Sequence, residues 1–505
     1  MHMLFYKKTK QRSARIFTKL YATQGTTIGM KASTNSMRLH HILTWICVIF
    51  FCGSSGAESL QEIYETALAQ DPLIAAARAT YRADSEARTQ GRAALLPQIS
   101  ATGTYSDNTY EVRDLDSFFV QDNKTETESK QYSVNLTQAI FDLPAWYRFQ
   151  RGKNLTARAK AQFAADQQDL IIRVSEAYFN VLRAFDDTKM REAEERAIKL
   201  QLDQTRERYQ VGLVPITDVH EAQAAYDEAT VNTLESQGTL RITFEDLGVL
   251  TGRKHEVLAG LDEQFFANPP DPVNSDDWVT FSLANNFQLK VAELAKKAAA
   301  HNAKAQKYQH LPKVNLALGY DKDRSDGTQA GVSGVKIPGF SGGALEATSR
   351  TIERETDNSG VRINVSMPIY SGGLIHSQRR QSAQQSVFAN QNYIAAKRNT
   401  EQSTRSLHHR AVTNSARVKA RSQSIISSTS ALEATEAGYE VGTRNIVDVL
   451  IAQRALYRAK RNHANARYDF IMSMMLLRQM AGQLSPDDIY QINAWLKPEL
   501  VVHLN

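Results

Sequence analysis

The chain carries the same sequence pattern twice, at positions about 230 residues apart. The first copy reads Y-Q-V-G-L-V-P-I-T-D-V-H-E-A-Q from Tyr209, and the second reads Y-E-V-G-T-R-N-I-V-D-V-L-I-A-Q from Tyr439. An upstream match pairs V-N-L-T-Q-A-I-F-D at Val134 with I-N-V-S-M-P-I-Y-S at Ile363. This unit is far longer than a solenoid repeat. We therefore predict an internal tandem duplication, in which the residues that differ between the two copies are candidates for function.

Each repeat is expected to contain strands, one very long helix and a shorter helix. Apolar and polar residues alternate in the strand segments, whereas the helical segments are long stretches without proline. In the first repeat, 58–275, we predict strands 98–112 and 131–141, a long helix 145–210 and a helix 216–250. In the second, 276–482, we predict strands 313–322 and 360–370, a long helix 374–440 and a helix 446–480. The remaining segments are the strand-connecting loops 113–129 and 321–358 and a C-terminal equatorial segment and tail, 483–505.

Residues 1–57 are interpreted as a secretory leader and signal peptide. The apolar stretch Ile42–Cys52 follows a basic segment and precedes the small residues Ser55, Gly56 and Ala57, which suit a signal-peptidase cut. Because a spanning helix needs about 20 apolar residues, the stretch is too short to cross a bilayer. A membrane anchor formed by this stretch is the alternative interpretation. We expect Glu58 to be the first mature residue, with translation starting at Met1, Met30 or Met37.

The basic character of the chain lies in this leader. The chain has 60 Lys and Arg and 54 Asp and Glu residues, but eight of the basic residues and none of the acidic ones precede Glu58. The rest has a net charge near −2, so the charge gives no support to nucleic-acid binding. Both cysteines, Cys47 and Cys52, also lie in the leader, which excludes disulfides and thiolate metal sites from the mature chain. The mean hydropathy of −0.42 excludes a bundle of membrane helices.

Motifs for catalysis are missing from the sequence. His220-Glu221 lacks the second histidine of a zinc-protease motif, and there is neither a P-loop nor a dinucleotide-binding fingerprint. His408-His409 is interpreted as a solvated or helix-packing pair, and Asp186-Asp187 as a solvated helix face. We therefore predict a protein that is not an enzyme and that has no cofactor and no metal.

The number of strands constrains the assembly. Four amphipathic strands per chain cannot close a barrel, and an open sheet edge in lipid would leave backbone groups unpaired. An oligomer is therefore required. A dimer would give eight strands and a filled interior, whereas a trimer would give twelve and room for a lumen.

Four segments carry a resemblance to a known family: Q-A-I-F-D at 138–142, A-Y-F-N-V-L at 177–182, and the two paired V-G turns at 209–219 and 438–450. Over essentially the whole mature chain the sequence resembles the TolC family of outer-membrane efflux proteins. The resemblance implies a mixed α and β homotrimer, with a twelve-stranded membrane β-barrel that continues into a long α-helical coiled-coil barrel in the periplasm of a Gram-negative bacterium. It implies an exit duct for efflux pumps or type I secretion systems. The expected partners are outer-membrane lipid, a periplasmic adaptor, and an inner-membrane pump or ABC transporter.

The resemblance also implies a periplasmic gate at the two V-G turns. Tyr439 and Asp218 match one pair of residues that holds the tunnel shut, and Arg444 and Thr217 match the other. The alternative is that these residues only cap their helices.

Two further roles follow from the same resemblance. Asp448 matches an aspartate that faces the pore axis, and Gly212 and Gly442 match the turns at which the adaptor docks. A second acidic ring one turn further on is expected in the family, but this sequence has Ile451 there. A secreted coiled-coil scaffold or adhesin is the alternative function; it would explain the helices and the leader, but neither the four strands nor the duplication.

Overall fold

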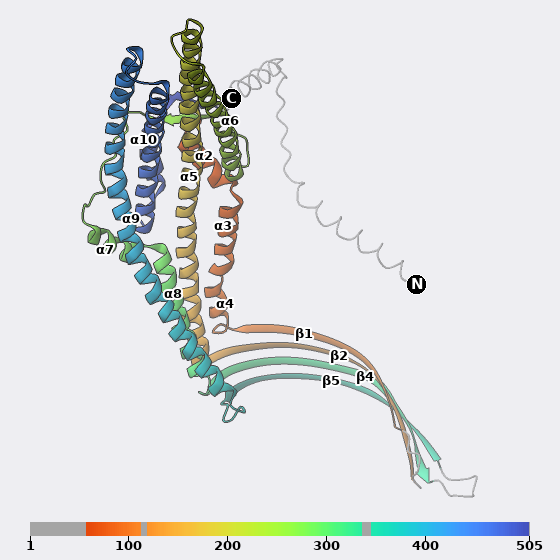
Figure 1. Cartoon of the computed structure of the whole chain (residues 1–505). Helices are drawn as coiled ribbons and strands as arrows, with labels where there is room; N and C mark the ends of the chain where they lie inside the picture. Colours follow the sequence, from red (N-terminus) through yellow and green to blue (C-terminus); the bar gives the residue numbers. More distant parts are fainter. Residues whose placement is uncertain (1–56, 113–118, 336–344, 504–505) are drawn as a thin grey trace, which may run out of the picture. The chain divides into compact units, whose positions relative to one another are not determined.

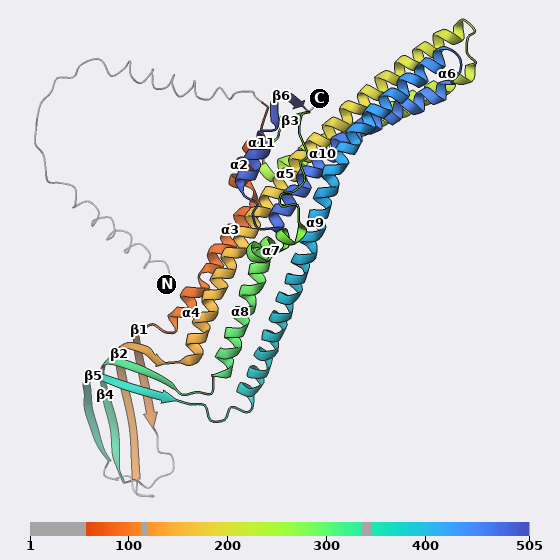
Figure 2. The ribbon, with the colours of Figure 1, turned by 90° about the vertical axis from the view of Figure 1, so that its left-hand side faces the viewer.

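The computed structural model describes residues 57–112, 119–335 and 345–503. The predicted leader lies outside the described residues, apart from Ala57. No helix in the described ranges is both long enough and apolar enough to cross a membrane. The described chain combines a helical layer with a four-stranded sheet (Figures 1 and 2).

Two long hairpins dominate the helical layer. Each runs from the sheet along one long helix, turns sharply at a tip, and returns along a helix of about half that length: α5 Leu143–Gln210, α6 Ile216–Thr251, α9 Leu374–Glu440 and α10 Ile446–Met480. Figure 1 shows α9 and α6 on the two flanks, with α10 and α5 between them. The two returning helices therefore stop halfway, and other helices occupy the half nearer the sheet.

Those shorter helices pack beside α5 and α9, where α6 and α10 do not reach. They are α2 Leu60–Gln70, α3 Pro72–Ser85, α4 Ala87–Ala93, α7 Ser275–Asn285 and α8 Phe287–Lys307. Side-chain caps set several of their starts. Ser59 and Glu62 form a reciprocal capping box at α2, and the Asp142 carboxylate accepts from the Ala145 amide at 2.8 Å at the start of α5. The order helix, strand pair, long helix, shorter helix thus occurs in both halves of the chain.

The large sheet is antiparallel, with the strand order β1-β2-β4-β5. Its strands are β1 Gln98–Val112, β2 Phe119–Phe141, β4 Lys313–Val335 and β5 Leu345–Ser366. Near the helices the register aligns apolar residues across all four strands: Ile99 is opposite Leu136, Leu136 is opposite Leu318, and Leu318 is opposite Val361. One face of this half of the sheet is therefore apolar.

The strands are much longer than predicted. The second strand was expected at 131–141 and the third at 313–322, whereas the ladders run on through residues predicted as loops. The prediction of loops at 113–129 and 321–358 is wrong for most of both ranges; residues 113–118 and 336–344 lie outside the described part. The fourth strand ends at Ser366 and not at 370. The reason is that backbone ladders do not require alternation: in the far half, charged side chains such as Lys322 and Glu355 pair across strands instead.

A second, two-stranded sheet was missed by the sequence analysis. It pairs β3, Val257–Leu261, with β6, Leu496–His503, and Glu58 adds a parallel bridge to Leu258. The segment expected as an irregular tail thus contains β6, preceded by helix α11, Pro486–Asn493. This sheet packs on α5, where the fully buried Tyr178 donates from its hydroxyl to the Ala259 carbonyl at 2.6 Å. The main hydrophobic core lies here, midway along α5.

Candidate functional site at the helical tips

The two hairpin tips have the same backbone conformation. Gly212 and Gly442 have φ of 77° and 79°, in the left-handed region that favours glycine. An added Cβ would meet nothing within 4 Å at either position, so the conformation and not the space requires glycine. The amides of Gly212 and Leu213 donate back to Tyr209 and Arg208 carbonyls, which closes the end of α5. The neighbouring valines, Val211 and Val441, are 70% and 75% exposed, so each tip presents bare backbone beside an apolar side chain.

Tyr439 is partly buried at the tip. It packs on a small hydrophobic cluster that includes Ile198 and Ile446, and the Arg208 guanidinium lies 4.8 Å from its ring centroid. Its hydroxyl is buried without a hydrogen-bond partner. No hydrogen bond among the described residues joins it to Asp218, the partner that the resemblance implied. The hydroxyl is therefore free to accept a partner that the single protomer does not supply.

Arg444, in the tip turn, pairs with the start of the helix that follows it. Its Nη1 lies 3.8 Å from Oδ2 of Asp448, in the first turn of α10. Thr217 contacts the adjacent Asp218 at 3.5 Å, and no hydrogen bond within the described ranges joins it to Arg444. Within one protomer, Arg444 thus contacts Asp448. Neither pair that the resemblance implies for the gate, Tyr439 with Asp218 or Arg444 with Thr217, is in contact.

Both tip carboxylates begin a helix. Asp218 lies in the first turn of α6 and Asp448 in the first turn of α10, where the helix dipole favours a negative charge. The Asp448 amide donates a hydrogen bond to the side-chain oxygen of Asn445 at 2.9 Å, which caps α10. Ile451 is 60% exposed, so an apolar side chain stands where a second carboxylate was expected. The arrangement offers fixed charge and hydrogen-bonding groups but no constellation for catalysis, and no group of metal-ligating side chains occurs among the described residues.

A partly buried carboxylate further from the tip on α5 was missed by the sequence analysis. Asp186 was interpreted as part of a solvated face, but it is only partly exposed at the crossing of α5 and α10, where it accepts a hydrogen bond from the Tyr468 hydroxyl at 2.7 Å. Burial raises the pKa of the Asp186 carboxyl. Its neighbour Asp187 stays partly exposed and pairs with Arg191 and Arg461. A doublet of acids carried no sequence signal that one of them turns inward.

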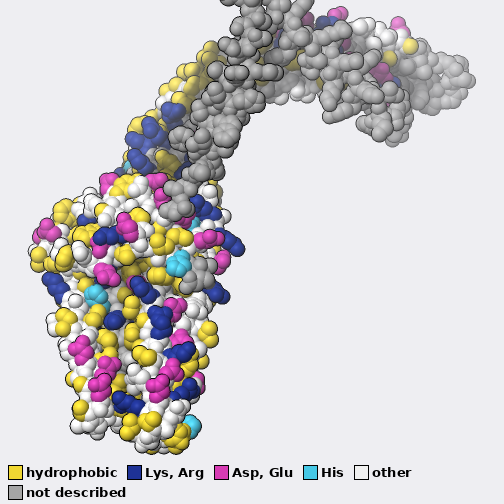
Figure 3. Space-filling model, turned by 90° about the horizontal axis from the view of Figure 1, so that it is seen from above, with side chains coloured by type: hydrophobic (Ala, Val, Ile, Leu, Met, Phe, Trp, Pro, Cys, Tyr) yellow, Lys and Arg dark blue, Asp and Glu magenta, His cyan; other side chains and the backbone are white. Residues whose placement is uncertain are grey.

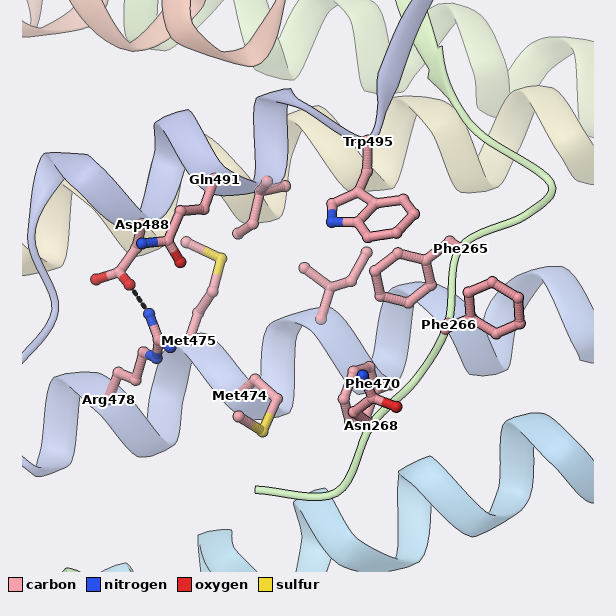
Figure 4. A pocket seen from close by; sticks show the side chains of 12 residues that line it. Phe265, Phe266, Asn268, Phe470, Met474, Met475, Arg478, Asp488, Gln491 and Trp495 are labelled. Atoms are coloured by element: carbon pink, nitrogen blue, oxygen red, sulfur yellow. Dashed lines mark hydrogen bonds and ion pairs between the residues drawn. The ribbon is translucent and has the colours of Figure 1, made fainter. Parts of the chain in front are cut away.

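A pocket lined by aromatic side chains lies near the C-terminal helix α11 (Figure 4). A cavity of about 200 Å³ separates α10 from α11 and from the segment after β3. Phe265 stacks edge-on against Trp495, and Arg478 forms an ion pair with Asp488 at the other end. The residues that line the pocket thus connect α11 to α10.

On the face seen in Figure 3, positive and negative side chains are interspersed with hydrophobic ones.

Comparisons with known proteins agree with this architecture. The model of the family described as "Outer membrane efflux protein" matches residues 63–253 and 278–483. The outer membrane protein TolC of Vibrio cholerae is 35% identical over 443 residues, which cover 87% of this chain and 94% of that protein. The alkaline protease secretion protein AprF of Pseudomonas aeruginosa is 25% identical, over 91% of this chain and 92% of that protein. The crystal structure of VceC from Vibrio cholerae has a TM-score of 0.66 at 16% identity, over 84% and 96% of the two chains, and so shares the fold.

Proposed function

This chain belongs to the outer membrane efflux protein family, and on that premise we propose that it is the outer-membrane exit duct of an efflux pump or a type I secretion system. It is a channel protein of a Gram-negative outer membrane that extends into the periplasm, and it is not an enzyme. The single observation that carries the proposal is the four-stranded sheet, which has an apolar face and two unpaired edges.

The unpaired edges support a trimer. β1 and β5 each have one neighbour in the sheet, so both leave a row of backbone groups without partners. Such an edge is not tolerated in hydrocarbon, whereas a closed barrel removes it. Three copies place twelve strands in one barrel, and eight strands from two copies would leave an interior filled by side chains. A duct requires the larger barrel.

The apolar residues form a band of membrane height. They lie in the half of the sheet nearest the helices, and their exposed members include Ile99, Tyr105, Tyr132, Val134, Val361, Ile363 and Val365. The far half of the ladders carries charged pairs instead. A spanning strand needs about 9–11 residues, so only the first part of each strand lies in lipid. Exposed aromatic residues at the helix end of the sheet, including Trp146 and Tyr370, fit the girdle of a membrane interface.

The long helices form the periplasmic tunnel. α5 and α9 have 68 and 67 residues, which at 1.5 Å per residue corresponds to roughly 100 Å. Three copies of the two hairpins give a ring of helices that continues from the barrel.

The tips close the tunnel in the resting assembly. In this proposal, Tyr439 bonds Asp218 and Arg444 bonds Thr217 when the three protomers come together. The unpartnered Tyr439 hydroxyl supports it, since a buried hydroxyl without a partner is unfavourable. Arg444 would exchange its contact with Asp448 for Thr217, and that contact, at 3.8 Å with both side chains partly exposed, is a weak one.

The exposed tip turns receive a periplasmic adaptor, which joins the duct to an inner-membrane pump or ABC transporter. Gly212 and Gly442 support this because they leave backbone accessible beside Val211 and Val441. Three copies of Asp448 around the axis form an acidic ring at the entrance. Like charges converging on an axis attract cations.

Reconstitution tests the function. Purified protein should migrate as a heat-modifiable trimer and should form discrete single channels in planar lipid bilayers. A secreted scaffold would form neither, so absence of both properties would refute the proposal.

A further inference from the structure

A second and larger cavity lies where the two-stranded sheet meets the helices. Its volume is about 760 Å³, and residues of α5, α10, β3 and β6 line it, with Ile425 of α9 at one side. Pockets of roughly 300–1,000 Å³ commonly hold small organic molecules. The cavity is therefore large enough for a ligand, and its lining decides which chemistry that ligand would have.

Three basic side chains of α10 line this cavity. Lys460, His463 and Arg467 are three and four residues apart, so they follow one another along about 10 Å of one helix face. Lys189 of α5 adds a fourth base. None of the four forms an ion pair with another described residue, and the Lys460 ammonium lies 5.1 Å from the centroid of the Tyr457 ring. Burial lowers the pKa of His463, so at neutral pH its ring is an uncharged hydrogen-bond donor.

Arg467 places its charge inside the wall of the cavity. It is 7% exposed, and its Nη2 donates to the Leu261 carbonyl at 3.4 Å and to the Asp262 carbonyl. A buried cation that is bound only to neutral carbonyls lacks a counter-charge, which is unfavourable. The Asp186 carboxylate also lines the cavity, but it accepts from the Tyr468 hydroxyl, and burial raises the pKa of its carboxyl. Asp186 therefore neutralises the bases less than a solvated carboxylate would.

The first repeat has no such row of bases. The corresponding residues of α6, 230 positions earlier in the chain, are neutral: Thr230, Thr233 and Gln237. Thr230 donates to Glu195 of α5 at 3.0 Å, and Gln237 donates to Glu192 of α5 at 3.1 Å. Neutral side chains thus suffice for a helix to pack against α5 at these positions. The bases of the second repeat are a difference between the copies that helix packing does not require.

The acidic residues at the rim of the cavity are exposed. Glu263 follows β3 and Glu499 belongs to β6; both line the cavity, and both are in contact with solvent. Water and salt screen exposed carboxylates, whereas the charge of Arg467 is buried and is screened much less. The wall therefore favours a negative ligand more strongly than the rim opposes it.

We propose that this cavity binds a small organic polyanion, whose carboxylate or phosphate groups contact Lys189, Lys460 and His463 beside the buried Arg467. Bases spread along about 10 Å of helix match a molecule with more than one negative group. The volume leaves room for its carbon skeleton against apolar lining residues such as Leu261 and Val501. The site lies within a single protomer, so it does not depend on the proposed channel.

Titration of the full-length protein, purified in detergent, tests the site. Calorimetry at low salt should show one site per protomer for citrate, which offers carboxylates, or for fructose 1,6-bisphosphate, which offers phosphates. The expected Kd is below about 1 mM. The tighter of the two probes identifies the anionic group. Fructose has no charge and should not bind.

A variant that copies the first repeat tests the bases. Lys460→Thr with His463→Thr introduces the residues found at 230 and 233 and keeps the buried Arg467. It should weaken binding by about tenfold or more, because it removes a charge and a hydrogen-bond donor from the wall. Arg458→Thr is the matched control, since it removes one charge from an exposed position of the same helix that does not line the cavity. It should change the Kd by less than about twofold. Equal thermal unfolding midpoints without ligand show that the variants are folded.

Removing the acidic rim tests the sign of the ligand's charge. Glu263→Gln with Glu499→Gln should tighten the binding of the anionic probe several-fold. Weaker binding in this variant would overturn the inference, as would equal Kd values for the wild type and Lys460→Thr with His463→Thr. Binding of neither probe would overturn it as well. A trimer that conducts but binds neither probe would leave the proposed function standing, whereas a protein that binds the probe and forms no channels would refute the function alone.

Discussion

Arg444 lies in the tip turn before α10, and its Nη1 is 3.8 Å from Oδ2 of Asp448 in the first turn of that helix. The arginine assigned to the gate therefore contacts the carboxylate assigned to the acidic ring. Closing of the gate and cation binding at the ring are therefore coupled through this one charge pair. Freeing Arg444 for Thr217 would leave Asp448 unpaired and more available to cations.

Removing both gate pairs should open the channel. Tyr439→Phe deletes the hydroxyl that we assign to Asp218, and Arg444→Glu replaces the gate cation by a charge that repels Asp448. We expect the double variant to show a several-fold higher single-channel conductance in planar bilayers. Tyr209→Phe changes the equivalent tyrosine of the first repeat and should leave conductance as in the wild type. Equal conductance of the wild type, the double variant and Tyr209→Phe would show that Tyr439 and Arg444 do not hold the channel closed.

A bulky side chain at the second tip should block assembly with the adaptor. Gly442→Trp should abolish efflux while heat-modifiable trimers persist in the membrane. Gly442→Asn is the matched control, because asparagine tolerates the left-handed conformation and adds little bulk. It should retain most of the efflux. Efflux that survives Gly442→Trp would place docking elsewhere.

The acidic ring should determine block by trivalent cations. Asp448→Ala should abolish the block of conductance by hexamminecobalt and reduce cation preference. Ile451→Asp adds three carboxylates per trimer and should tighten the block by about tenfold or more, because converging charges raise the local cation concentration. A helix-capping role alone is worth about 0.3–1 kcal/mol and would not alter the block. If hexamminecobalt blocks the wild type and Asp448→Ala equally, Asp448 serves only to cap its helix.

The two adjacent acids on α5 should respond oppositely to neutralisation. The pKa of Asp186 is raised in the folded protein, so its favourable contribution is present at low pH and is lost as pH rises through the folded pKa. Asp186→Asn keeps an acceptor for Tyr468 and should raise the thermal stability of the trimer at pH 7, with little effect at pH 4. Asp187→Asn loses contacts to Arg191 and Arg461 and should lower stability by on the order of 1 kcal/mol. Thermal unfolding across pH 4–8 measures both; a lower stability of Asp186→Asn at pH 7 would contradict the assignment.

Periodicity predicted the elements that have one apolar face. The strands near the helices were recognisable because residues such as Ile99 and Leu136 alternate with polar ones. The long helices were recognisable as long stretches without proline. In the far half of β2, residues 123–131 are polar on both faces, so the apolar alternation ends there while the backbone ladder continues. β3 and β6 are short and pair over more than two hundred residues, and no local pattern reports such a pairing.

The repeat and the resemblance predicted which residues lie at the tips, but they did not predict the contacts of these residues within the protomer. The sequence could not indicate that Tyr439 would pack into a cluster with its hydroxyl unpartnered, because that depends on helices from both hairpins meeting. Burial of Asp186 depends on the same crossing of α5 and α10.

Single-channel recording of the purified protein tests the central claim most directly. We predict that the wild type forms heat-modifiable trimers and inserts into planar bilayers as discrete, cation-preferring channels of low conductance. Trimers without conductance, in both the wild type and the gate variant Tyr439→Phe with Arg444→Glu, would contradict the account of this chain as an outer-membrane duct.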